Sequence, residues 1–163
     1  MTQNATSVLD NVKRSVEKFL RDNLETAESL KISWEGYPFE SGATAAYEWI
    51  QPRLLGFNDP SWQPKASSNT RGNTASVLLN TNCFVNKENI TASNRHYVLR
   101  DTVNKHLYSG VSIPLRDYVG GTTRPWACLM VVAGITTDTA IPNENWLQYN
   151  YTVKLEWLRE WKD

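Results

Sequence analysis

Histidine and cysteine, the side chains that most often do chemistry near neutral pH, are scarce in this sequence. The chain contains two of each, at His96, His106, Cys83 and Cys128. The histidines lie ten positions apart on a predicted helix, about 15 Å along its axis, so they cannot share a metal ion. We expect both at the edge of the core. Both cysteines lie in apolar strand-like segments, so we expect buried free thiols, with a disulfide as the alternative.

Carboxylates and glycines also form no recognisable catalytic pattern. Asp101 lies beside Arg100 on a predicted helix and Asp117 follows Arg116 near a turn, which is typical of a solvated surface rather than a dry cleft. The glycine-rich run 120–124 precedes a predicted strand and not a helix, so we expect a turn rather than a phosphate-binding loop. No dinucleotide fingerprint, His-Glu-x-x-His or Cys-x-x-Cys motif occurs. We therefore expect neither an enzyme nor a cofactor.

Length and composition are consistent with one α+β domain over residues 1–163. Seventeen basic residues balance seventeen acidic ones, which is not the charge of a nucleic-acid or membrane-surface binder. The N-terminal residues carry no apolar signal sequence, and no window is long enough to predict a transmembrane helix. Seven Trp and seven Tyr predict broad aromatic contact surfaces, in a core or at an interface.

The clearest structural signal is the strict alternation of residues 147–157. The apolar members are Leu147, Tyr149, Tyr151, Val153, Leu155 and Trp157, and every residue between them is polar. Side chains on a strand alternate between its two faces, so this stretch predicts a long strand with one face on a core. We interpret the aromatic face as ordinary core beneath helices. The alternative is a ligand cavity over this last strand.

The other elements follow from periodicity and from glycine and proline positions. We predict helices at 7–24 and 92–109, strands at 30–35, 45–55, 75–86, 111–115 and 126–135, a loop at 56–74 and a turn at 136–145. Pro52 and Pro114 predict edge positions or bulges. Residues 126–135 are apolar at both parities, which predicts a central strand covered on both faces. The fold class is α+β, with a mostly antiparallel sheet, two main helices packed on it and a long C-terminal β-hairpin.

The predicted loop 56–74 is too long for an idle connection in a compact domain. It carries two prolines, two glycines and many Ser and Asn residues, which argue against regular structure. Trp62 either anchors another subunit or packs back on its own domain. We interpret this segment as a candidate docking segment.

Nearly the whole chain resembles a known family in the order of its elements. Residues 97–107 (YVLRDTVNKHL) lead into 111–119 (VSIPLRDYV), and a hairpin with an aromatic-rich last strand follows. With the N-terminal helix and the early strand pair, this order resembles the tail terminator (tail completion) proteins of tailed bacteriophages. The likeness is one of architecture over nearly the whole chain and carries no diagnostic motif.

The resemblance implies a structural virion protein without catalysis, cofactor or membrane. Six copies would form a ring that caps the tail tube and joins it to the head-tail connector, with DNA only as passing cargo. The protein would be assembled in the host cytoplasm and located in the virion neck, with 56–74 and 136–145 as docking segments. The candidate interface residues are Trp62, Arg71, Arg124, Trp126 and Trp161. The alternatives are a connector or tail tube subunit, or a monomeric ligand-binding or enzymatic domain with an aromatic pocket.

Overall fold

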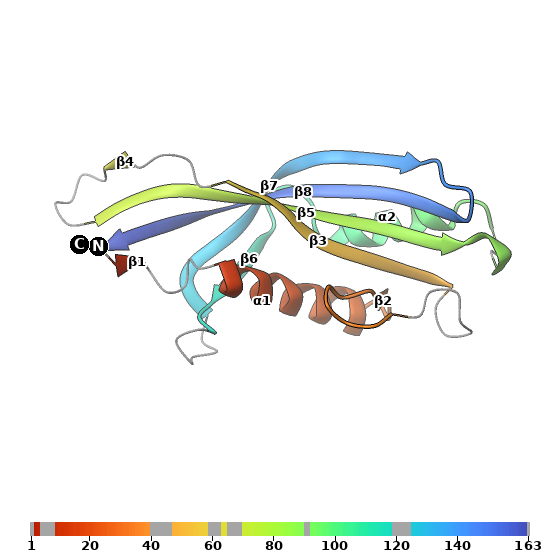
Figure 1. Ribbon diagram of the computed structural model, residues 1–163, viewed down its shortest axis with the longest axis horizontal. Coiled ribbons are helices and arrows are strands. Elements are labelled where there is room, and N and C mark those ends of the chain that lie inside the picture. The colour runs from red at the N-terminus through yellow and green to blue at the C-terminus, as the bar shows by residue number, and fades with distance from the viewer. Residues whose placement is uncertain are drawn as a thin grey trace.

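The computed structural model describes residues 2–3, 9–39, 47–58, 63–64, 70–89, 92–118 and 125–162. The elements are β1 (Thr2–Gln3), α1 (Leu9–Leu20), η2 (Arg21–Thr26), β2 (Lys31–Ile32), β3 (Glu48–Asn58), β4 (Gln63–Pro64), β5 (Thr70–Asn86), η3 (Lys87–Asn89), α2 (Arg95–His106), β6 (Ser112–Arg116), β7 (Pro125–Ile141) and β8 (Trp146–Lys162). This order confirms the predicted α+β class. Its long hairpin is β7–β8 (Figure 1).

The strands form one curled sheet in the order β2-β3-β5-β8-β7-β6. All its pairings are antiparallel except that of β2 with β3. Strands β5 and β8 pair without a bulge along their whole length of 17 residues each. The short strands β1 and β4 lie off this path, on β8 and β5 respectively.

The core lies between one face of this sheet and the helices. Alternate residues of β8 are buried on that inner face, from Tyr149 to Trp157, which confirms that the aromatic stripe is ordinary core. Helix α1 contributes Val12, Val16 and Leu20 to the same cluster. Since residues on a strand alternate, the intervening side chains of β8 belong to the opposite face.

Helix α1 is tied to the edge strand β6 by two buried polar residues. Asn11 accepts a hydrogen bond from the Tyr118 backbone N–H at 2.8 Å, and Ser15 Oγ accepts one from the Arg116 N–H at 2.9 Å. Asn11 Nδ2 also donates to Asp117. The predicted helix 7–24 is confirmed in place, although its last turns adopt π geometry as η2. Residues 7 and 8 of the predicted helix lie outside the described residues.

Helix α2 covers the other part of the inner face. Helical spacing predicts an inward stripe of His96, Leu99, Val103, His106 and Leu107, of which all but the half-buried His106 are buried. The helix ends at His106 with Leu107 as its C-cap, so Gly110, a residue type that often ends helices, does not cap it. Gly110 instead has a φ of 95° and donates its N–H to the Val132 carbonyl in the turn to β6. A left-handed backbone suits glycine, which has no Cβ to clash there.

Two segments predicted to be irregular are largely strand. The predicted turn 136–145 is wrong because β7 continues to Ile141, so only residues 142–145 turn. The predicted loop 56–74 is wrong at both ends, where β3 and β5 extend into it, and β4 lies within it. In both places a long partner strand supplies hydrogen bonds to polar residues of modest strand preference, so tertiary context overrides local propensity.

Strand β7 is not covered on both faces, which corrects the prediction for residues 126–135. Burial alternates there: Met130 and Val132 are buried, whereas Leu129 is 49% and Val131 is 37% exposed. The reason is that both helices pack on the same face of the sheet. The apolar side chains on the other face therefore meet no described helix.

The two prolines mark weakly paired edges, as predicted. Strand β6 is the edge strand that carries Pro114. Strand β3 pairs on its outer side with β2 only at Trp49 and Ile50, so Pro52 follows the last residue of that pairing. Cys83 is a buried free thiol, and burial raises its pKa to about 12. The side chain of Cys128 is not among those described.

Tyr151 tests the assignment of the aromatic stripe to the core. Its side chain has no exposed surface, and its hydroxyl lies 2.9 Å from the Leu107 carbonyl oxygen. We expect Tyr151→Ala to lower the free energy of unfolding by about 3–5 kcal/mol because it leaves a large cavity. Tyr151→Phe should cost about 1 kcal/mol for the lost hydrogen bond. Urea denaturation measures both. The exposed Tyr108 is the control, and an equally small loss from Tyr151→Ala and Tyr108→Ala would contradict a core position.

Candidate functional site

The face of the sheet opposite the helices, called the open face below, is the candidate site. The registers of four strands place its residues in five rows. The rows, each from β3 across β5 and β8 to β7, are Trp49–Phe84–Gln148–Ile141, Gln51–Asn82–Asn150–Thr139, Arg53–Asn80–Thr152–Thr137, Leu55–Leu78–Lys154–Gly134 and Asn58–Ser76–Glu156–Val131. Four strands spaced about 4.8 Å apart and about nine residues long give a surface of roughly 600 Å².

The centre of the open face is a ladder of amide and hydroxyl side chains. Asn80 Nδ2 donates to Asn150 Oδ1 at 3.1 Å and to Thr152 Oγ1 at 2.8 Å. Asn82 Nδ2 donates to Asn80 Oδ1, and Gln148 Nε2 donates to Asn82 Oδ1. These groups satisfy one another without water. A partner can therefore cover them at a lower dehydration cost than it would pay for unbonded polar groups.

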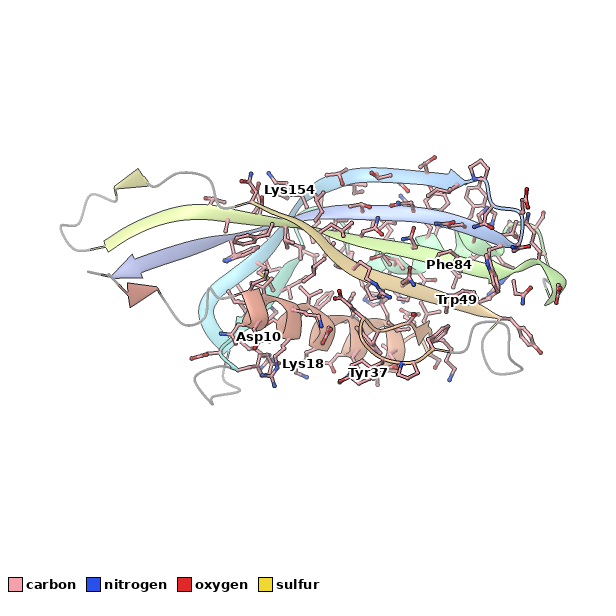
Figure 2. All side chains as sticks on the ribbon, viewed as in Figure 1. Asp10, Lys18, Tyr37, Trp49, Phe84 and Lys154 are labelled. Atoms are coloured by element: carbon pink, nitrogen blue, oxygen red, sulfur yellow. The ribbon has the colours of Figure 1, made fainter. Side chains whose placement is uncertain are left out.

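One end of the open face is aromatic. Trp49 stacks on Phe84 with ring centroids 5.2 Å apart and meets Trp146 edge-on at 4.8 Å (Figure 2). Phe39, from the segment before β3, lies 5.6 Å from Trp49. Trp49 is buried by these rings although no described helix covers it. The result is a rigid apolar end to an otherwise polar surface.

Charge is almost absent from the open face. Of the twenty positions in the five rows, only Arg53, Lys154 and Glu156 are charged. Lys154 Nζ lies 2.6 Å from Glu156 Oε1. Arg53 Nη1 donates to the backbone carbonyls of Ser33 and Pro52, at 2.9 and 2.7 Å. The open face thus offers neutral hydrogen-bonding groups and apolar side chains rather than a charged patch.

The strongest electrostatic cluster lies on the other face, under α2. Arg100 makes a two-pronged ion pair with Asp138, and Tyr149 Oη donates to Asp138 Oδ1 at 2.8 Å. The hydrogen bond from Arg100 holds the pKa of Asp138 below its usual value, and burial raises the pKa of Tyr149. The Arg100 guanidinium also lies 5.2 Å from the centre of the Tyr151 ring. This cluster joins α2 to β7 and β8, and sequence reasoning missed it because Asp138 was assigned to a turn.

The two histidines are in different environments. His96 is buried against the rings of Tyr97 and Tyr149, whereas His106 Nε2 lies 2.7 Å from Glu28 Oε1. Hydrogen bonds from Lys105, which has the larger effect, and from His106 hold the pKa of Glu28 below its ordinary value. No group of three His, Cys, Asp or Glu side chains among the described residues is placed to hold a metal ion. No helix in the described ranges is long and apolar enough to span a membrane.

The predicted interface residues are only partly placed. Trp62 and Arg124 lie outside the described residues, as does the whole run 120–124 with its glycines. Arg71, Trp126 and Trp161 lie in β5, β7 and β8, where the structure describes the backbone but not their side chains. The pairing of Arg71 with Trp161 places those two residues opposite each other across neighbouring strands.

His96 generates a prediction about pH. Burial lowers its pKa, and its Nδ1 has no hydrogen-bond partner within the described structure. The unfolded chain takes up this proton near pH 6.5 and the folded chain only at lower pH. The unfolded state therefore binds more protons as pH falls below about 6.5, and the free energy of unfolding decreases until the folded pKa is passed.

Urea midpoints at about pH 7.5 and about pH 5.5 should show this decrease. The variant His96→Gln should have a smaller decrease over the same range because it removes the titrating group. The assignment is wrong if the wild-type and variant midpoints fall in parallel.

Comparisons with known proteins identify the fold and no family. No protein-family model matches the chain, and a search of curated proteins finds no match. One solved structure, of a protein whose name carries no functional description, is 10% identical in sequence and has a TM-score of 0.50. The alignment covers 93% of this chain and 96% of that one. At this identity the likeness concerns the architecture alone: an α+β fold of this kind occurs in another protein over nearly its whole length.

Proposed function

We propose that this chain is a structural virion protein of a tailed bacteriophage, a tail terminator. Copies of it form a ring, most simply a hexamer, that caps the tail tube and joins it to the head-tail connector. The observation that carries the proposal is the open face, a wide surface of the sheet that carries few charges and is left uncovered by both helices. We infer that this face lines the channel of the ring and that the helices lie outside it.

A channel wall with few charges suits the passage of DNA. Double-stranded DNA carries one phosphate charge per about 1.7 Å of its axis, and proteins hold it chiefly through Lys and Arg. On the open face, Lys154 is paired with Glu156, and Arg53 is bound to backbone carbonyls. DNA would meet amide and hydroxyl groups that already bond to one another. Such a wall offers little to retain the duplex.

Exposed apolar residues support assembly with other protein chains. Leu55 is 50% exposed on β3, and Val131 is 37% exposed on β7, beside the edge strand β6. A stable contact between subunits buries about 800 Å² on each partner, usually around apolar anchors. The open face carries such apolar side chains toward both ends of its strand order, as a ring subunit requires.

The ring itself is tested with purified protein and tail tubes. Electron microscopy of the mixture should show one ring at the head-proximal end of each tube, and capped tails should join connector-bearing heads. The tubes without the protein are the control. Rings that never bind tube ends, or unaltered joining of heads to uncapped tails, would refute the terminator function.

The channel wall is tested by adding charge at an exposed position. Thr139 lies on the open face and its side chain is exposed. We expect Thr139→Lys to leave folding and tail capping unchanged and to slow DNA passage, because a ring would add one cation per copy facing the phosphates. Thr139→Glu is the matched control and should not retain DNA. Infectious titre and DNA release from particles measure the effect; equal behaviour of both variants would place Thr139 away from the DNA.

A further inference from the structure

The sheet edges at β3 and β6 are unsuited to pairing with another strand. On β3, Pro52 lacks an N–H, and a register shift separates Leu55 from Asn58, with Gly56 at a φ of 59°. On β6, Pro114 lacks an N–H, and a second shift separates it from Arg116. Proline and bulges are devices by which proteins prevent edge-to-edge association. Contact between copies at these two edges must therefore use side chains.

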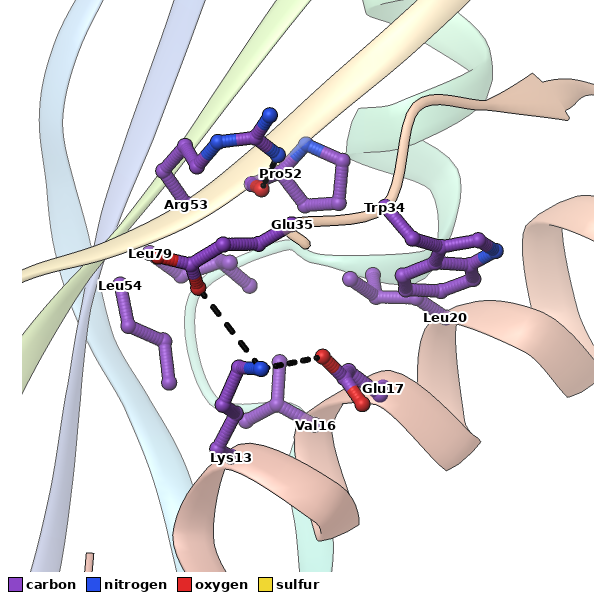
Figure 3. A pocket seen from close by; sticks show the side chains of 10 residues that line it. All are labelled: Lys13, Val16, Glu17, Leu20, Trp34, Glu35, Pro52, Arg53, Leu54 and Leu79. Carbon is purple, nitrogen blue, oxygen red and sulfur yellow. Dashed lines mark hydrogen bonds and ion pairs between the residues drawn. The ribbon is translucent and has the colours of Figure 1, made fainter. Parts of the chain in front are cut away.

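A groove for such contact runs between α1 and the edge strand β3. Its apolar lining comes from both elements and from the sheet behind them, and comprises Leu9, Leu54, Leu55, Phe57 and Val77. The groove has a volume of about 520 Å³, which is enough for several side chains. It continues into a narrow slot of about 20 Å³ between α1 and Trp34 (Figure 3).

The charged side chains at the mouth of the groove pair with one another, although acidic groups outnumber basic ones there. Lys13 projects from α1 and lies 3.2 Å from Glu17 and 3.8 Å from Glu35, so it bridges the helix and the segment before β3 (Figure 3). Val16, Leu20 and Leu79 line the slot behind these charges. The apolar floor of the groove favours an apolar occupant, because a charged group that entered it would lose its hydration.

An apolar ridge, formed by Leu129 and Val131 of β7, lies across the sheet from the groove and next to the edge strand β6. In the row that contains Val131, this residue and Asn58 of β3 lie at opposite ends, three strand spacings apart, or about 14 Å. The ridge and the groove are therefore different surfaces of one molecule. The sequence of β7, apolar at both parities, is typical of a strand covered on both faces, yet the described helices cover only one.

We propose that the ridge at Leu129 and Val131 of one copy packs into the α1–β3 groove of the next. This proposal rests on the proposed ring, for which it names the contact between subunits. A surface that fits a different surface of an identical copy makes a head-to-tail contact, which closes into a ring or continues as a filament. The contact would cover the exposed apolar side chains of Leu55 in the groove and of Leu129 and Val131 on the ridge. It would bring no unpaired charge with it.

The first test uses two variants of the full chain, Leu55→Asp in the groove and Val131→Asp on the ridge. Both side chains are exposed, so both variants should unfold at the wild-type urea midpoint. Each should weaken self-association at least about tenfold, because a carboxylate entering an apolar contact loses its hydration. Val98→Asp is the matched control, since Val98 is 39% exposed on α2, away from both surfaces, and this variant should associate normally.

The second test mixes the two variants. The intact ridge of the Leu55→Asp chain fits the intact groove of the Val131→Asp chain, so an equimolar mixture should give dimers that grow no further. Native mass spectrometry counts the copies. For weak association, amide resonances of residues 54–56 in labelled Val131→Asp chain should shift when unlabelled Leu55→Asp chain is added at millimolar concentration.

Dimers in the mixture, or shifts at residues 54–56, support the ridge–groove contact. Wild-type association by either single variant overturns it, and so does a mixture with neither dimers nor shifts. If rings cap tail tubes equally well with both variants, the contact is wrong and the ring function stands. If wild-type protein gives no ring on tail tubes, the function fails, and the resonance shifts still decide the contact.

Discussion

Strands β5 and β8 pair in one unbroken antiparallel register, from Thr70 opposite Lys162 to Asn86 opposite Trp146. A slip of one residue would move every side chain of β8 to the wrong face, placing Tyr151 and Leu155 in water and Asn150 and Lys154 under the helices. The register is fixed because both helices bury the same parity of both strands. The same constraint produces the open face, because the alternate residues that do not pack against the helices form the opposite face of the sheet.

The two faces of strand β8 could be predicted from the sequence. Residues 147–157 showed their faces directly because β8 is long, regular and buried on one side only. Strand β7 was predicted to be covered on both faces because it is apolar at both parities, whereas both helices pack on one face of the sheet and leave Leu129 and Val131 exposed. The ion pair between Arg100 and Asp138 was missed for a related reason, since it depends on β7 running beyond Ile135. The amide ladder needs the registers of two strands, which no single stretch of sequence contains.

The low charge of the open face is a compromise between two opposing physical requirements. A fully apolar face of this size would promote non-specific aggregation of the free subunit. A face rich in Lys and Arg would bind polyanions, and one rich in Asp and Glu would repel neighbouring copies. Amides that bond to each other, as Asn80 and Asn150 do, keep the surface wettable and leave few groups unsatisfied when it is covered. Apart from Leu78 on β5, the apolar residues of the five rows lie in β3, in β7 or in the aromatic first row.

The distribution of ion pairs separates folding from assembly. Arg100 with Asp138, Arg95 with Glu48, and Lys105 with Glu28 all join α2 to other elements. None of these six residues belongs to the rows of the open face. The inner side therefore holds both the buried apolar residues and the electrostatic ties of the helix, whereas on the open face the only ion pair is that of two neighbours on β8. Substitutions at exposed open-face positions should thus change what the surface meets while leaving the packing that creates it intact, so that assembly can be altered without unfolding the subunit.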